Sequence, residues 1–110
     1  MPVNDEDKKI ITLARAGRAR TGAAEGAAVR DETGRTYSAT SVDLPSLKLS
    51  ALHVAVAMAV SSGAEDLEAA ALVTAADTVG DADLAAVRDL GPKAAVFVAA
   101  PDGSLKAALT

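Results

Sequence analysis

The sequence predicts an α/β protein with three α-β-α layers, in which helices cover both faces of a mixed sheet that has an N-terminal hairpin. Helical and strand-like patterns follow one another in the order α, β, β, α, β, α, β. Half of the 110 residues are apolar but only 2% are aromatic, so small aliphatic side chains must build the core, which suits helices lying flat on a sheet. This length fits one domain, which we expect to span residues 1–110.

The first part of the chain predicts a helix followed by a hairpin. Asn4 precedes three acidic residues, so it can cap the first free amides while the acids favour the positive end of the helix dipole. We expect this helix over about residues 5–19. Two strand-like runs near 25–31 and 35–42 flank an Asp-Glu-Thr-Gly turn. The first run contains Gly26, which allows close approach of either a packed helix or a ligand.

The central segment LKLSALHVAVAMAVSSG predicts a helix over about 49–62 that has almost no polar side and ends at Gly63. Val54, Ala57 and Met58 are apolar on the side away from the sheet. Since a helix that is apolar all round is normally buried all round, we expect this second side to meet another helix or a second subunit. The residues expected on the sheet are Leu49, Leu52, Val56, Ala59 and Val60.

The last third of the chain predicts two buried strands around one helix. The continuous apolar run around 67–75 is typical of a strand covered on both faces. A helix with an acidic start is expected over 81–91, where a Gly-Pro pair stops it. A second buried strand is expected over 94–100, and a Pro-Asp-Gly turn then leads into a short apolar tail.

Composition excludes several classes of function. The absence of cysteine excludes disulfides and thiolate metal sites, and with one histidine a protein-only zinc site would need carboxylates for nearly all its ligands. The net charge of −4 gives no reason to expect nucleic acid as a partner, since that binding depends on basic residues. The polar, acidic start does not match a signal peptide, and no apolar segment approaches the roughly 18–20 residues that span a bilayer. We therefore expect a cytoplasmic protein with no membrane partner.

Three stretches carry a family resemblance. Residues 25–28 are Glu-Gly-Ala-Ala, residues 41–43 are Ser-Val-Asp, and residues 50–63 run from Ser-Ala-Leu to Ala-Val-Ser-Ser-Gly. They resemble, in order, the Val-Gly-Ala-Ala strand, the Asn-x-Glu strand end and the Cys-Ala-Glu to Ala-Val-Ser-x-Gly helix of the small homotetrameric cytidine deaminases. The resemblance covers nearly the whole chain and implies the cytidine deaminase-like fold. It also implies a homo-oligomer, either a dimer or a tetramer.

The family's chemistry depends on residues that this chain replaces. Zinc deaminases hold Zn²⁺ with three Cys or His ligands, and a glutamate moves protons between the metal-bound water and the pyrimidine. The resemblance places Ser50 at the first ligand position and Leu52 at the glutamate, while the later Pro-Cys-x-x-Cys falls at about Gly80 and Asp83. Serine is a poor zinc ligand, glycine has no side chain and leucine carries no proton. We therefore expect no catalytic residue, no metal ligands, no cofactor and no zinc-dependent deamination.

Three other polar residues are candidates for ligand binding. Ser41 and Asp43 stand where the family's Asn-x-Glu holds the ribose hydroxyls of a nucleoside, but Ser and Asp are also common at strand ends. His53 stands where the family has arginine. It is either a ligand or general base, or a histidine that pairs with a carboxylate or a backbone group at a subunit contact.

Three functions follow from these residues. The first is a noncatalytic assembly or regulatory module that binds another protein or a small polar ligand, because a fold can persist without its catalytic site. The second is a metal-free enzyme that uses Asp43, His53, Ser50 or Asp83. The third is a nucleoside-binding protein that uses Ser41 and Asp43 without turnover. All three predict self-association.

Overall fold

The computed structural model describes residues 3–110; Met1 and Pro2, the first two residues of the predicted domain and of its polar start, lie outside the described part. The helices are α1 (Asp5–Thr21), α2 (Ala51–Ser61) and α3 (Asp81–Leu90). The strands are β1 (Gly26–Asp31), β2 (Thr36–Thr40), β3 (Val42–Leu44), β4 (Leu47–Leu49), β5 (Leu67–Val73), β6 (Ala95–Ala99) and β7 (Leu105–Leu109).

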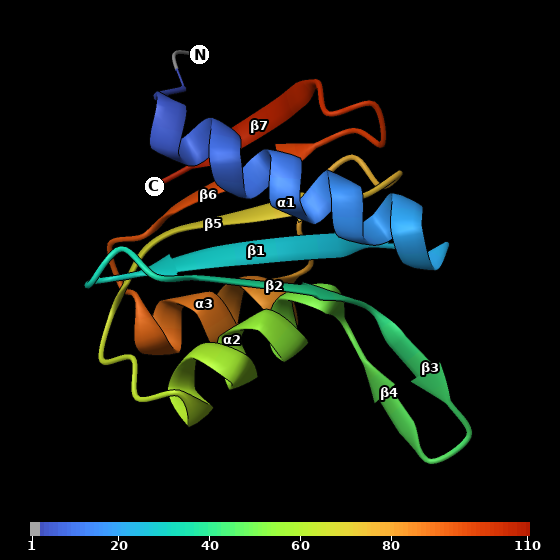
Figure 1. Cartoon of the computed structure of the whole chain (residues 1–110), viewed down its shortest axis with the longest axis horizontal. Coiled ribbons are helices and arrows are strands. Elements are labelled where there is room, and N and C mark those ends of the chain that lie inside the picture. Colours follow the sequence, from blue (N-terminus) through green and yellow to red (C-terminus); the bar gives the residue numbers. More distant parts are fainter. Residues whose placement is uncertain (1–2) are drawn as a thin grey trace.

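A mixed five-stranded sheet forms the middle layer, in the order β2-β1-β5-β6-β7. Strand β1 is antiparallel to β2 and β5, whereas β5 and β6 are parallel and β7 returns antiparallel to β6. Helix α1 packs on one face, and α2 and α3 pack on the other (Figure 1). This arrangement confirms the predicted three-layer α/β fold with its N-terminal hairpin.

Helix α1 lies closely on β1. Asn4 caps the helix by accepting a 2.8 Å hydrogen bond from the Asp7 backbone amide, as the sequence predicts. The fully buried Ile10 and Ala14 face the sheet. A Cβ on Gly26 would lie 2.0 Å from the Ala14 carbonyl oxygen, so the close neighbour of this glycine is the helix backbone and not a ligand.

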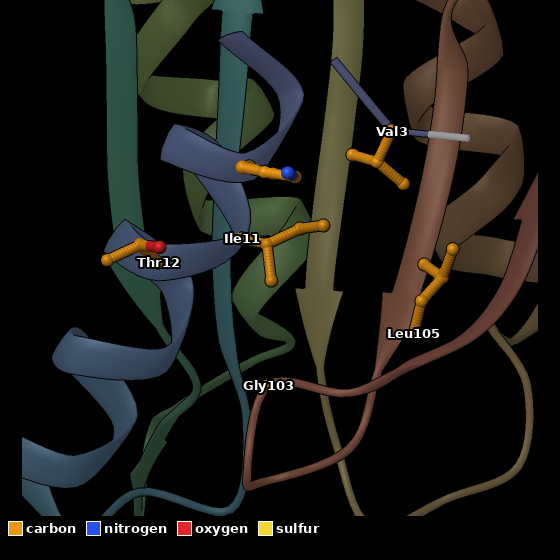
Figure 2. Close-up of a pocket in the computed structure, with 6 residues that line it drawn as sticks. Val3, Ile11, Thr12, Gly103 and Leu105 are labelled. Carbon is orange, nitrogen blue, oxygen red and sulfur yellow. The ribbon is translucent and has the colours of Figure 1, made fainter. Parts of the chain in front are cut away.

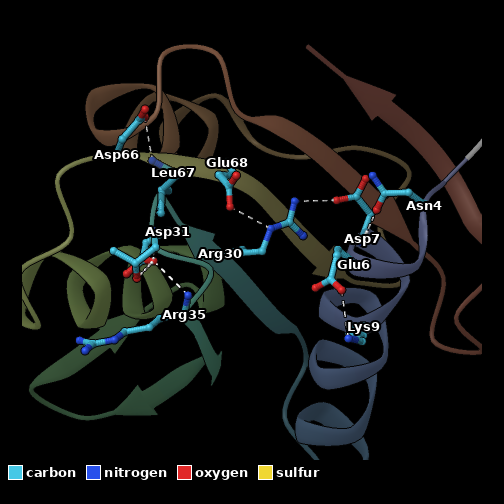
Figure 3. A network of polar contacts seen from close by, with 11 residues as sticks. Asn4, Glu6, Asp7, Lys9, Arg30, Asp31, Arg35, Asp66, Leu67 and Glu68 are labelled. Carbon is cyan, nitrogen blue, oxygen red and sulfur yellow. Dashed lines mark hydrogen bonds and ion pairs between the residues drawn. The ribbon is translucent and has the colours of Figure 1, made fainter.

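An ion-pair network fixes the start of α1 to the sheet (Figure 3). Arg30 on β1 donates from Nη2 to Asp7 Oδ1 at 3.0 Å and from Nε to Glu68 Oε1 at 3.3 Å. The side chains of Arg30 and Asp7 are each only 12% exposed. The network therefore joins α1, β1 and β5 on the side of the sheet opposite α2.

The hairpin turn between β1 and β2 is organised by Asp31, which is 2% exposed. Its carboxylate accepts hydrogen bonds from Thr33 Oγ1, the Thr33 and Arg35 backbone amides and the Tyr37 hydroxyl, at 2.7 to 3.1 Å. Burial acts to raise the pKa of Asp31, but these hydrogen bonds outweigh burial and hold the pKa below its ordinary value. The Asp31 carboxylate therefore stabilises the turn between β1 and β2.

Two expectations about the middle of the chain are wrong. The helix begins at Ala51 and not at residue 49, because residues 42–49 form a second, two-stranded hairpin from β3 and β4. Leu49, expected on the sheet, lies in β4 and is 37% exposed, and Val60 is 53% exposed. In the single chain α2 buries one stripe, whose members are Ala51, Leu52, Ala55, Val56 and Ala59, and its outer side is open to solvent.

The C-terminal part also differs from the prediction. The chain leaves β5 after Val73, two residues early, and the apolar tail after the Pro-Asp-Gly turn forms an edge strand, β7. Lys106 on β7 donates to the carbonyl oxygens of Thr74 and Ala76, so this strand also holds the loop that leads to α3. Within residues 3–110, no helix combines the length and the apolar character that crossing a membrane requires.

Candidate functional site

The N-terminal ends of α2 and α3 meet at the positions that the sequence singles out. Ser50 is the N-cap of α2 and accepts a 3.1 Å hydrogen bond from the His53 backbone amide. Its hydroxyl donates to Asp83 Oδ1 at 2.6 Å, and Asp83 lies in the first turn of α3. Gly80 is the N-cap of α3 and provides no side-chain hydrogen bond. The Ser50 hydroxyl thus caps one helix and ties it to the other.

His53 is the second link between the two helices. Its Nε2 lies 3.1 Å from the Ala82 carbonyl oxygen and 3.5 Å from Asp83 Oδ1, and its side chain is 38% exposed. In the tautomer that carries a proton on Nε2, the ring donates to the Ala82 carbonyl. The sequence left two alternatives for His53, and these contacts match the one in which the ring pairs with a carboxylate or a backbone group. The location of His53 at a subunit contact stays a prediction.

Leu52 stands in the hydrophobic core. Its side chain is fully buried in the cluster formed by α2, α3 and the sheet, with Val29, Leu72 and Val98 among the other members. The side chain does not face a solvent-filled space. Position 52 therefore contributes packing where the family resemblance places a proton-transferring acid.

The donor atoms at this joint do not fit a zinc ion. The oxygen and nitrogen atoms that lie together here are Ser50 Oγ, His53 Nε2 and Asp83 Oδ1. The Ser50 hydroxyl donates its proton to Asp83, which is the carboxylate that would have to bind the metal. A catalytic zinc site holds its ion with three protein ligands, usually His, Cys or a carboxylate. Across residues 3–110, no group of three or more His, Cys, Asp or Glu side chains is placed to hold a metal ion.

Ser41 and Asp43 have their contacts elsewhere. Ser41 Oγ accepts a 3.3 Å hydrogen bond from the Glu25 backbone amide. This bond links the residue after β2 to the residue before β1. Asp43 lies on β3, where its side chain is 87% exposed and sits 4.0 Å from Lys48 Nζ. The structure thus brings Ser50, His53 and Asp83 together, and it gives Ser41 a structural hydrogen bond and Asp43 an exposed ion pair.

A shallow pocket that sequence reasoning did not predict lies on the other side of the sheet (Figure 2). It has a volume of about 350 Å³ and lies between the start of α1 and the β6–β7 turn. Its polar groups are Lys8 and Thr12, and the remaining lining residues are Val3, Ile11, Gly103 and Leu105. The pocket contains no acid, imidazole or thiol, and Lys8 and Thr12 are the lining residues with polar side chains.

The Ser50–Asp83 link predicts a measurable stability effect. Ser50→Ala removes an N-cap and leaves Asp83 without its donor, so we expect a loss of about 2 kcal/mol in the free energy of unfolding. Asp83→Ala should cost about 1 kcal/mol, because the serine still caps α2. Urea unfolding of both single variants and the double variant gives the coupling energy. Strictly additive effects would contradict a direct link between the two side chains.

The five-stranded mixed sheet, the single helix on one face and the two helices whose N-termini meet on the other define a three-layer protein of the cytidine deaminase type. A sequence model of the cytidine deaminase-like family matches residues 3–103, so the chain belongs to that family. This confirms the resemblance that the sequence motifs predict. No curated protein sequence gives a significant match.

Solved structures agree on the fold. A cytidine deaminase from Burkholderia pseudomallei superposes with a TM-score of 0.79 at 22% identity, over 93% of this chain and 90% of that one. A cytidine deaminase from Mycobacterium leprae gives a TM-score of 0.67 at 19% identity, over 93% of this chain and 92% of that one. At such identities the likeness establishes the fold alone.

Proposed function

We propose that this chain is a catalytically inactive member of the cytidine deaminase-like family that serves as an oligomeric assembly module. The observation that carries the proposal is the 2.6 Å hydrogen bond from Ser50 to Asp83. It joins two positions that the family resemblance assigns to zinc ligands. The hydrogen bond between this hydroxyl and this carboxylate stabilises the contact between α2 and α3, and it engages the Asp83 Oδ1 atom with a protein partner.

The buried Leu52 supports the same proposal from the acid–base side. Deamination needs a group that moves protons at the reacting carbon, and a leucine cannot supply one. Because Leu52 is 0% exposed, a substrate would have to displace core packing to reach this position. The contact between the N-terminal ends of α2 and α3 therefore stabilises the fold through packing and hydrogen bonding.

The outer side of α2 supports self-assembly as the function of this chain. No acidic residue lies in its first turn and no basic residue in its last turn, and Met58 and Val60 are 39% and 53% exposed. A helix with exposed apolar side chains gains free energy when a partner covers it, at about 1 kcal/mol for each half-exposed aliphatic side chain. We infer a homo-oligomer, a dimer or a tetramer, in which this side of α2 is covered.

Turnover and ligand binding test the proposal directly. Protein supplied with equimolar Zn²⁺ and millimolar cytidine should release no uridine above the rate in buffer, and cytidine or uridine should leave the melting temperature unchanged. A melting shift without turnover would instead support a nucleoside-binding protein that uses Ser41 and Asp43. Turnover that His53→Ala or Asp43→Ala abolishes would support an enzyme. Either result would contradict the proposal.

A further inference from the structure

The two faces of the main sheet are covered unequally. Helices α2 and α3 lie on one face, whereas α1 covers the other (Figure 1). Helix α1 packs mainly over β1, β2 and β5, and among residues 3–110 no second helix lies beside it over β6 and β7. The pocket between α1 and the β6–β7 turn, with its volume of about 350 Å³, lies at this uncovered margin.

The lining of the pocket combines apolar side chains with a positive charge. Ile11, only 8% exposed, is directed from α1 toward Val3 and Leu105 (Figure 2). Lys8 lies one helical turn before Thr12, and both line the pocket. Within the described residues, no carboxylate lies at ion-pair distance from the Lys8 ammonium group. An ammonium group beside an aliphatic surface fits a ligand that carries both a negative charge and an apolar body.

The β6–β7 turn adds an arginine and an acid beside the pocket. Gly103 lines the pocket, and a Cβ built on it would lie 3.2 Å from Arg15 Cδ and 3.6 Å from Arg15 Nη1, so the arginine side chain lies against this turn. Asp102 accepts hydrogen bonds from the Ser104 hydroxyl at 2.6 Å and from the Ser104 amide at 2.8 Å. No lining residue is acidic, so Lys8 sets the charge of the lining, and Arg15 offsets the charge of Asp102 beside it.

A neighbouring hollow of about 380 Å³ on α1 shares Lys8 and Thr12 with the pocket. Its other lining residues include Asp5 and Lys9, and Lys9 pairs with Glu6 at 3.1 Å. An anion in this hollow would be repelled by the Asp5 carboxylate. The pocket beside the β6–β7 turn is therefore the better site for an anion.

We propose that the pocket binds a small aliphatic carboxylate, with its charged end on Lys8 and its chain over Ile11 and Leu105. The ammonium group donates a charge-assisted hydrogen bond to the carboxylate, and the chain removes apolar surface from water. A cavity of about 150 Å³ holds a benzene molecule, so about 350 Å³ suits a chain of about six carbons. An α-helix, about 10 Å across, is too wide for this space.

This site does not depend on the proposed function. It lies on the opposite face of the sheet from the contact between Ser50 and Asp83. Loss of either site by substitution therefore leaves the other to be measured on its own.

Chemical-shift mapping locates the ligand. Hexanoate is titrated into ¹⁵N-labelled protein at constant pH and ionic strength, and the backbone amide signals are followed. We expect saturable shifts at Thr12, Gly103 and Leu105, with a dissociation constant on the order of 1 mM, since the pocket is shallow and the ligand is small. Shifts that do not saturate, or that are scattered over residues far from the pocket, would mean adventitious contact only and would overturn the proposal.

Two comparisons test the role of the charge. Hexanol, which has the same chain without the carboxylate, should bind at least about 5-fold more weakly than hexanoate. Lys8→Gln should raise the dissociation constant of hexanoate by about 5-fold or more. The matched control is Lys48→Gln, an exposed lysine on β4 outside the pocket lining, which should change it by less than about 2-fold. Equal binding of hexanol and hexanoate, or equal effects of the two substitutions, would contradict a carboxylate site at Lys8.

Discussion

Replacing Leu52 by glutamate, the residue type that the family uses for proton transfer, is expected to unfold the protein or nearly so. The side chain at this position is 0% exposed and packs against α3 and the sheet. An ionised carboxylate there would have no partner, and a protonated one would still leave polar atoms in an apolar core. We expect the free energy of unfolding to fall by about 4 kcal/mol or more, which is a large part of the stability of a small domain.

Leu52→Met is the matched control, because it keeps the volume and the apolar character. It should cost less than about 1.5 kcal/mol. Urea denaturation followed by circular dichroism measures both variants. If the glutamate variant were as stable as the methionine variant, position 52 would have to face solvent, and the interpretation of α2 as a packing helix would be wrong.

Gly26→Ala is the second change with a large expected effect. The new Cβ would lie 2.0 Å from the Ala14 carbonyl oxygen and 3.1 Å from Arg18 Cβ. The first of these is a backbone atom, so no rotamer change relieves the clash, and α1 must move away from β1. We expect a loss of about 3 kcal/mol in the free energy of unfolding, because α1 loses part of its buried contact with the sheet.

Gly80→Ala provides the comparison, since Gly80 has φ −70° and no atom lies within 4 Å of a Cβ built there. This substitution should change stability by less than about 1 kcal/mol, because the restriction of the unfolded chain and the poorer N-cap that alanine provides for α3 oppose each other. Thermal unfolding of the two variants side by side tests the difference. Equal melting temperatures would mean that α1 does not lie on β1 as described.

Most of the fold could be predicted because its elements carry strong local signals. Asn4 and the acids after it mark the start of α1, and the apolar runs of β5 and β6 are typical of strands covered on both faces. The small hairpin could not be predicted, since each of its strands has three residues and Pro45 lies between them. Strand β7 was missed for a different reason: its five residues form an edge strand only because β6 offers them a partner.

The candidate site was predicted in part. Motif spacing marked Ser50 and Asp83, and these side chains are in contact although 33 positions separate them in the chain. Sequence patterns gave no indication that the serine donates to the aspartate or that His53 contacts the Ala82 carbonyl, because both contacts depend on how α3 packs beside α2. The outer side of α2 was expected to be buried, and in the single chain it is open to solvent, so its burial against a partner stays a prediction.

The zinc content of the protein, purified without chelator and then dialysed against Zn²⁺, tests the central claim most directly. We expect less than about 0.1 zinc per chain, because the positions that the family resemblance assigns to the zinc ligands and the glutamate hold Ser50, Leu52, Gly80 and Asp83. A chelator should not change the melting temperature. A content of about one zinc per chain, with a melting temperature that falls when the metal is removed, would contradict the account.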